Sequence, residues 1–448
     1  MAQFIFIKYL SLALTAARSL ILAAVMGPQS YGFLGTLVVV QQYFSYAAMG
    51  MREGLTVRLA QPPRAQETPP SIHSSALAWG LGVGVAIVVS IFVLRLWQNQ
   101  LGIEWMWVGL ISLLSILNEI LINIHRDQGR LNKVALLELI YNVMPLACVL
   151  YLRRDVSTLA VLQAMAAGLL ISILAYLHGL SGVGLRHVDR RLIARMLVLG
   201  IPLAVASFFS ASVTSVYVLV ANAMHMGSSI GLVAFANSLC SIVLFGSNMV
   251  AWAATSKSMR GLAAAESHAA DVRNRRLSIF FRLSTLASVL AIVLSSFAFD
   301  LLLPAYRGAE RYALYFCLLQ ANSLLLYVEL NFLAVHAKSM LVAADYGVML
   351  GMTLLAYYLV TDIGLLALVT VGIVLSFSLA VLCALYCRKL GMRAVQGLKP
   401  QIAFLAFPSL CAFATHLNGL IGAAVVVAIY IALALYALRA SLSRTSSA

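Results

Sequence analysis

A single arginine lies in the middle of the first long apolar stretch of this 448-residue sequence. Arg18 follows Lys8 by ten residues, and Ser11 and Thr15 lie at helical spacing on the same face. An ionisable group inside a membrane is costly, so each one is a candidate for function. A guanidinium at that depth suits bidentate binding of two phosphate oxygens, and we expect its face to turn toward a cavity. The structural alternative is an arginine paired with a carboxylate or a backbone carbonyl.

Polar stripes follow other apolar segments. Segment 105–124 and its end carry Ser112, Ser115, Glu119, Asn123 and Arg126 on one helical face, and segment 135–152 adds Glu138 and Asn142. Three further asparagines, Asn237, Asn248 and Asn322, are candidates for hydrogen bonds to substrate hydroxyls. Small polar side chains also join helices inside membranes, so packing is the favoured role for any single one.

Two acidic residues in the second half are candidates for coupling transport to an ion. Glu329 belongs to a seven-residue repeat within segment 312–337, with Tyr315, Asn322 and His336. It has no basic residue on its own face, so it either pairs with Arg18 or exchanges a proton, because burial disfavours the charged form. Asp345 lies within two turns of Lys338, which favours a plain ion pair near the membrane interface.

Basic residues also gather where the apolar segments end. Arg52, Arg58 and Arg126 are predicted to lie at the same cytoplasmic end of the helices. Topology and anionic lipid headgroups explain them by default. An anionic headgroup arriving from the inner leaflet would meet the same residues, so Arg52 and Arg126 join the candidate binding residues.

The elements that position these residues are transmembrane helices. The chain is 62% apolar and 10% charged, with a mean hydropathy of +0.96, whereas soluble domains have about 45–50% apolar and about 25% charged residues. The six cysteines all fall within apolar stretches without a metal-site pattern, and we expect no cofactor or metal. The N-terminal stretch predicts a first spanning helix rather than a signal peptide.

Fourteen apolar segments are long enough to be helices that cross or enter the membrane. Their predicted ranges are 5–26, 33–50, 75–97, 105–124, 135–152, 158–180, 195–222, 230–250, 279–303, 312–337, 340–360, 364–386, 401–415 and 419–438. With both termini in the cytoplasm, most Lys and Arg residues, Arg282 among them, fall on cytoplasmic segments, as the positive-inside rule requires. The net charge of +15 then reflects topology and membrane lipids, not nucleic acid, because the basic residues are dispersed.

Two similar phrases divide the chain. MGPQSYG (26–32) and MGSSIG (226–231) each follow the first helix of a six-helix block, where each predicts a tight external turn. Parallel repeats of this kind enclose a central site in several transporter folds. The sequence therefore predicts an all-α polytopic membrane protein with lobes 1–190 and 191–390 around a cavity, and a C-terminal helix pair with a basic tail in 391–448.

The phrase G-P-x-x-Y-G, the stretch GMREGLTVRLA (50–60) and G-I-P at 200–202 carry a family resemblance. The chain resembles the polysaccharide-flippase branch (O-antigen type) of the multidrug/oligosaccharidyl-lipid/polysaccharide exporter superfamily. The resemblance implies a protein of the bacterial inner membrane that moves an undecaprenyl-pyrophosphate-linked oligosaccharide from the inner to the outer leaflet. It further implies that a polysaccharide polymerase and chain-length proteins are partners of the chain.

Two other classes of function compete with the flippase. A cation-coupled multidrug antiporter of the same superfamily would favour an acid in the first lobe, where helix 5–26 instead has Arg18; Glu119 and Glu329 keep this alternative open. A membrane-embedded polysaccharide-modifying enzyme would need a large external loop or a catalytic motif, and the sequence has neither. Without a P-loop, transport must run on an ion gradient or on the substrate's own gradient. We therefore predict a transporter that is not an enzyme.

Overall fold

The computed structural model describes residues 2–60, 69–98, 102–152, 156–178, 180, 187–227, 229–263, 268–335, 339–359, 364–390 and 398–445. Within these ranges the regular elements are all helices, with no strand. The first part of the chain forms α1 (Ala2–Ser45), η1 (Tyr46–Ala48), α2 (Met51–Ala60), α3 (Pro69–Trp97), α4 (Glu104–Asp127), α5 (Leu131–Leu152) and α6 (Thr158–Leu177). The remainder forms α7 (Arg190–Ala223), α8 (Ser229–Ala263), α9 (His268–Leu302), η3 (Pro304–Tyr306), α10 (Ala309–Leu325), α11 (Tyr327–Val335), α12 (Ser339–Leu359), α13 (Leu365–Lys389), α14 (Leu398–Leu405) and α15 (Phe407–Thr445).

These helices confirm the predicted all-α polytopic membrane fold. Among the described residues, nine helical stretches are long and apolar enough to cross a membrane, and the first of them, Phe6–Ala48, contains two of the predicted segments. Shorter apolar helices follow at Tyr346–Leu359, Ile402–Leu417 and Ile421–Ala432.

The chain forms two compact units. The first contains Met1–Phe208 and His225–Phe235, and the second contains Phe209–Met224 and Ala236–Ala448, so α7 and α8 each contribute to both. The lobe boundaries predicted at residues 190 and 390 describe a sequence repeat and stay a prediction.

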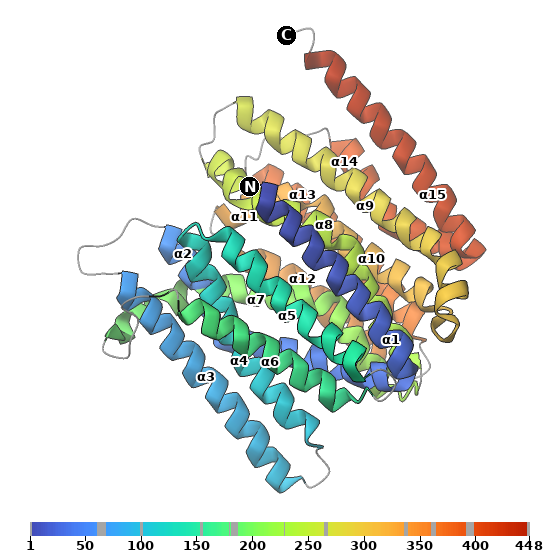
Figure 1. The fold of residues 1–448 in the computed structure, drawn as a ribbon. Helices are drawn as coiled ribbons and strands as arrows, with labels where there is room; N and C mark the ends of the chain where they lie inside the picture. The colour runs from blue at the N-terminus through green and yellow to red at the C-terminus, as the bar shows by residue number, and fades with distance from the viewer. Residues whose placement is uncertain are drawn as a thin grey trace. The chain divides into compact units, whose positions relative to one another are not determined.

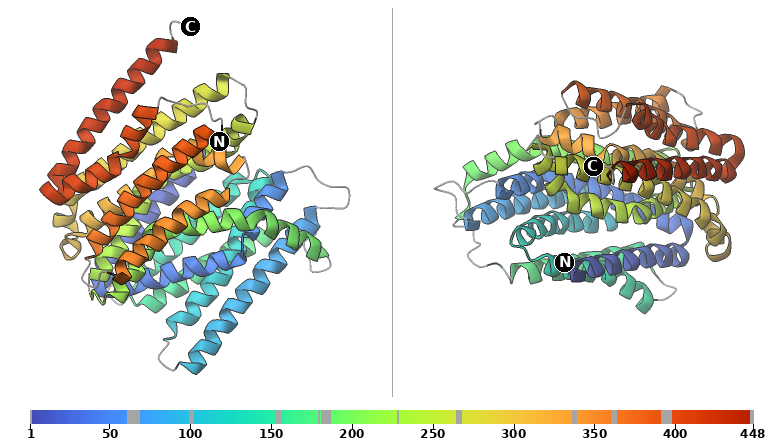
Figure 2. Two further views of the ribbon diagram at one scale, coloured as in Figure 1. Left: turned by 180° about the vertical axis from the view of Figure 1, so that it is seen from behind. Right: turned by 90° about the horizontal axis from the view of Figure 1, so that it is seen from above.

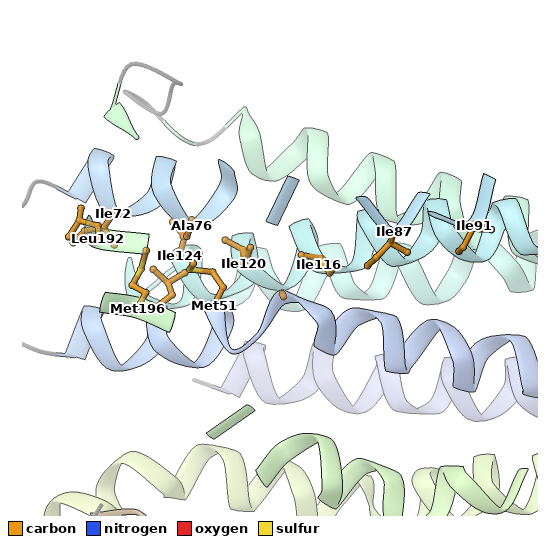
Figure 3. Close-up of a cluster of buried hydrophobic side chains, with 12 residues drawn as sticks. Met51, Ile72, Ala76, Ile87, Ile91, Ile116, Ile120, Ile124, Leu192 and Met196 are labelled. Carbon is orange, nitrogen blue, oxygen red and sulfur yellow. The ribbon is translucent and has the colours of Figure 1, made fainter. Parts of the chain in front are cut away.

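In the first unit the helices pack in neighbouring pairs. The helix α5 lies along α1, α3 lies along α4, and α6 packs against both α4 and α5 (Figure 1). A buried apolar cluster joins α2, α3, α4 and the start of α7, and its α4 members Ile116, Ile120 and Ile124 share one face at four-residue spacing (Figure 3). Inside a membrane such faces are held by van der Waals packing, because lipid tails are as apolar as the side chains.

The predicted external turn at 27–32 is shorter in the structure. The helix α1 consists of two helices that meet at Gly27, which has φ 71° and ψ 168°. Gly27 supplies the positive φ that other residues rarely adopt. Pro28 begins the second helix, where its missing N–H has no helical partner to lose. The prediction of a loop over the following residues is therefore wrong, because they are already helical.

The two similar phrases pack against each other within the first unit. A Cβ atom added to Gly231 would lie 1.9 Å from the Pro28 carbonyl oxygen, and one added to Gly32 would lie 2.7 Å from the Gly231 nitrogen. Beside this contact the rings of Tyr31 and Phe235 meet edge to face at 6.1 Å. The glycines of these phrases thus allow two helices to touch backbone to backbone, in addition to forming turns.

A second glycine contact joins α2 to α7. Gly50 and Gly54 have the four-residue spacing of small residues that brings membrane helices together. A Cβ atom at Gly54 would lie 1.8 Å from the Met196 carbonyl oxygen, and one at Gly200 would lie 1.8 Å from the Gly50 carbonyl oxygen. This contact fixes the start of α2, and Arg52 with it.

In the second unit α9 packs against α10 and α15, and α13 packs against α10 and α12 (Figure 2). The predicted helix 312–337 is interrupted at Leu326, so Tyr315 on α10 and Glu329 on α11 belong to separate helices. A seven-residue repeat places residues on one face only while the helix is continuous. The expectation of one continuous helix over 312–337 is therefore wrong, and the shared polar face of Tyr315 and Glu329 stays a prediction.

Candidate functional site

Arg18 lies where the first half of α1 runs along α5. Its Nη1 donates a hydrogen bond to Asn142 Oδ1 at 3.4 Å, and the Tyr141 hydroxyl is a second hydrogen-bond partner. The Asn142 amide nitrogen in turn donates to the Ser11 hydroxyl at 2.9 Å. Ser11 and Arg18 were expected to share one face, and both contact Asn142 on α5. The expectation that this face also lines a cavity stays a prediction.

The partners of Arg18 are neutral. Within the described part of the chain no carboxylate lies within 4.0 Å of its guanidinium, because the nearby acid of α5, Glu138, pairs with Lys8. The predicted alternative of an Arg18–carboxylate pair is therefore absent from the described residues. Arg18 itself is half-buried, so its positive charge is held in place by hydrogen bonds and is not cancelled by a neighbouring anion.

Arg52, at the start of α2, has the opposite environment. Its Nε donates to Glu53 Oε1 at 2.9 Å, and its Nη1 donates to Glu119 Oε2 on α4, also at 2.9 Å. The three side chains line a pocket together with Ser45, Tyr46, Ala48, Gly50, Ile116, Ile120 and Ala204. The side chains of Arg52 and Glu119 are 35% and 36% exposed, so this ion-pair cluster is partly open.

The two carboxylates determine the protonation of Arg52. Burial alone would lower the pKa of its guanidinium, but the charges of Glu119 and Glu53 outweigh burial and raise that pKa above its ordinary value. Arg52 is therefore cationic at every physiological pH. Two carboxylates against one guanidinium give the cluster a net negative charge when both acids are ionised.

Arg126 lies beside this cluster. Its Nη2 donates to Thr56 Oγ1 on α2 at 3.1 Å, and the Thr56 hydroxyl donates to the Arg52 carbonyl oxygen at 3.0 Å. Glu119 and Arg126 were predicted on one helical stripe, and Arg52 and Arg126 at one end of the helices. The structure brings all three close together. Asn123, one turn before Arg126, is 6% exposed, and Ser112 bonds the Val108 carbonyl of its own helix. Both of these stripe members are buried among packed helices.

In the second unit Glu329 interacts electrostatically with Arg282 on α9. The side chains are 8% and 5% exposed, and the Arg282 guanidinium lies 4.4 Å from the centre of the Phe404 ring. The assignment of Arg282 to the cytoplasmic side stays a prediction, but the residue lies within α9 and is buried there. The apolar residues on both sides of it, Phe281 and Leu283, were the signal for this.

The remaining predicted residues differ in how far they are described. The side-chain oxygen of Asn237 on α8 is buried and has no hydrogen-bond partner among the described residues. Asn248, Asn322 and Asp345 lie outside the side chains that the structure describes. Glu53 and Tyr46, which line the pocket with Arg52, were not predicted as site residues. The signal that could have found them is their closeness to Arg52 in the sequence. In the part of the chain that is described, no three His, Cys, Asp or Glu residues are placed to hold a metal ion.

Known structures share this fold at low sequence identity. An inward-facing multidrug resistance MATE family transporter of the MOP superfamily matches with a TM-score of 0.65 and 15% identity, over 87% of this chain and 96% of the other. The lipid II flippase MurJ, in an inward closed conformation, matches with a TM-score of 0.65 and 10% identity, over 99% and 100%. A MATE mutant matches with a TM-score of 0.55 and 14% identity, over 89% and 96%. No protein-family model and no curated protein matches the sequence. The chain therefore has the fold of MOP superfamily transporters, over nearly its whole length.

Proposed function

We propose that this chain is a flippase of the bacterial inner membrane. Its substrate is an undecaprenyl-pyrophosphate-linked oligosaccharide, which it moves from the inner to the outer leaflet for assembly of a surface polysaccharide such as O-antigen, exopolysaccharide or capsule. The fold supports a transporter, since it is shared with multidrug transporters and with a lipid II flippase. The observation that carries the choice of an anionic substrate is Arg18, a cation inside an apolar helix whose described partners are neutral.

The chemistry of the headgroup fits this cation. A guanidinium binds two phosphate oxygens at once, and a low-dielectric surrounding strengthens the interaction. Because Asn142 and Tyr141 bring no charge, a pyrophosphate does not have to displace a carboxylate to reach Arg18. Arg52 is different, since Glu53 and Glu119 already occupy its donors.

The mechanism that we propose is alternating access. The headgroup enters from the inner leaflet past Arg126 and Arg52, Arg18 holds the pyrophosphate, and Asn123, Asn237, Asn248 and Asn322 bond the sugars. The two lobes then rock and release the headgroup on the outer side, while the lipid tail stays in the bilayer. Glu329 and Asp345 are the candidates for coupling transport to an ion gradient. Both termini lie in the cytoplasm in this proposal. A polysaccharide polymerase and chain-length proteins then act on the translocated substrate.

The test is transport of a fluorescent isoprenyl pyrophosphate by the purified chain in liposomes, read by quenching of the outer-leaflet dye. We expect Arg18→Gln to lower the rate roughly 30-fold or more, because loss of a buried charge-assisted contact costs about 2–5 kcal/mol. Arg18→Lys should keep part of the rate, since lysine keeps the positive charge but cannot bind two phosphate oxygens in the bidentate geometry of a guanidinium. Arg95→Gln, which also removes an arginine from an apolar helix, is the matched control. Full transport by both Arg18→Gln and Arg18→Glu would exclude this role.

A second candidate is a cation-coupled multidrug antiporter. It is favoured by the pocket in which Glu53 and Glu119 face a single guanidinium, because the excess carboxylate suits a proton or an organic cation. This function predicts that the chain in liposomes exchanges ethidium for protons when a proton gradient is imposed, and that Glu119→Gln abolishes this transport. The flippase function predicts no ethidium transport by the unsubstituted chain or by Glu119→Gln.

A further inference from the structure

Asn142 is the residue that orients the surroundings of Arg18. A side-chain amide has one donor end and one acceptor end, so a bond made by one end fixes the direction of the other. The Nδ2 of Asn142 donates to the Ser11 hydroxyl at 2.9 Å, and both residues are buried, at 8% and 1% exposure. This bond leaves Oδ1 directed at the Arg18 guanidinium, 3.4 Å away.

The ion-pair cluster at Arg52 shows what a charged partner does at the same kind of contact. Glu119 occupies one Nη of Arg52 just as Asn142 occupies one Nη of Arg18, but Glu119 contributes a negative charge. An incoming anion at Arg52 is therefore repelled by the carboxylate that holds the guanidinium. At Arg18 the amide oxygen accepts the same kind of hydrogen bond with no such repulsion.

From this contrast we infer that Asn142 is a specificity-determining residue that sets the charge preference of the Arg18 site. It positions Arg18 with a neutral acceptor, so that the site takes the pyrophosphate group of an isoprenyl-linked substrate. The inference rests on the proposed function and deepens it, because it says why this arginine and not Arg52 is the anion ligand. Asn142 acts through Arg18 and is a positioning residue.

The replacement Asn142→Asp separates this role from a structural one. Aspartate has almost the same shape and keeps an acceptor for Arg18, but it adds a carboxylate beside the guanidinium. We expect an Arg18–Asp pair like the Arg52–Glu119 pair, with thermal stability equal to or above that of the unsubstituted protein. Anion binding should fall although the fold is intact. A purely structural Asn142 predicts the opposite, a loss of stability and unchanged binding by the molecules that stay folded.

The experiment measures binding of farnesyl diphosphate to the purified full-length protein in nanodiscs, together with its thermal unfolding midpoint. We expect Asn142→Asp to weaken binding about a hundredfold, since a like charge against a bound anion is strongly unfavourable. Asn142→Ala, which removes the acceptor without adding charge, should weaken binding only severalfold. The control is Asn132→Asp, the same change on the same helix at an exposed asparagine that bonds Gln3, and its binding should stay within twofold.

The outcomes distinguish the inference from the proposed function. Tight binding by Asn142→Asp, together with lost binding by Arg18→Gln, overturns the inference and leaves the anion site at Arg18. Unfolding of Asn142→Asp also overturns it, because the added charge is expected to pair with Arg18. Tight binding by Arg18→Gln overturns the proposed function itself. Weak binding by both variants with normal unfolding midpoints supports both.

Discussion

Arg18 and Arg52 belong to the same unit, and each donates a hydrogen bond from one Nη to a side-chain oxygen on a partner helix. The partners of Arg18 are a neutral amide and a neutral hydroxyl, whereas Arg52 has two carboxylates. Both guanidinium groups are held by hydrogen bonds, but only the Arg52 guanidinium has anionic partners among the described residues. The difference shows that the position of an arginine in a membrane helix does not define its role until the charge of its partners is known.

The two arrangements also differ in what they contribute to the fold. Removing one member of a buried ion pair leaves its partner as an uncompensated charge, which is far more costly than losing a neutral hydrogen bond. Arg52, Glu53 and Glu119 therefore depend on one another, and they join η1, α2 and α4 around one pocket. We therefore expect the loss of Arg18 to destabilise the fold less than the loss of Arg52.

The largest effect on stability that this comparison predicts is for Arg52→Ala. The change leaves Glu53 and Glu119 without a cation, and we expect the free energy of unfolding to fall by about 1–3 kcal/mol, less than for a fully buried pair because the side chains are partly exposed. Denaturation of the purified protein in detergent measures it. Adding Glu119→Gln to Arg52→Ala should restore about half of the loss, as a double-mutant cycle would show. Arg18→Ala should cost clearly less, and an equal cost would remove the distinction between the two sites.

A smaller change is expected when the Arg52 cluster is made more like the Arg18 site. Glu119→Gln removes one of the two carboxylates, so an anion should bind Arg52 more tightly by about tenfold, or about 1.4 kcal/mol. Farnesyl diphosphate binding would be measured in the Arg18→Gln background, so that only the Arg52 pocket contributes. Glu104→Gln, at the other end of α4, is the control. Unchanged affinity would mean that the carboxylate does not govern anion binding at Arg52.

The smallest effect is expected for Glu138→Gln. Its partner Lys8 lies on the same face of α1 as Ser11, but neither side chain contacts Arg18 among the described hydrogen bonds. An ion pair that is partly exposed contributes about 1 kcal/mol or less to stability. We expect transport of the fluorescent pyrophosphate to stay within about twofold of the unsubstituted rate. A loss as large as that of Arg18→Gln would extend the anion site along α1 to Lys8.

Individual residues show how far the sequence could predict the site. The depth of Arg18 and the shared face of Ser11 and Arg18 follow from helical spacing, and the structure keeps both on one face toward α5. The predicted stripe on α4 included Glu119, but its partner Arg52 lies 67 residues away in the chain. Local periodicity carries no information about which distant helix faces a given residue.

Two features of the second unit were not predicted from the sequence. Arg282 was expected among the basic residues at the end of a membrane helix, and the contacts of its side chain were not predicted. Its guanidinium lies against the Phe404 ring and interacts electrostatically with Glu329. The break at Leu326 has no Gly or Pro beside it to mark it in the sequence. We find no physical reason in the described contacts for the interruption at that residue.

The sequence by itself determined the class of protein and its helical segments, because the length and apolarity of a segment decide whether it can lie in a bilayer. It also placed glycines at the points where helices turn. Only the tertiary structure decided that these glycines bring backbones into contact, and that Asn142 meets Arg18 while Glu119 meets Arg52. The reason is that the charge around a side chain is set by groups from other helices, and their identity depends on packing in three dimensions.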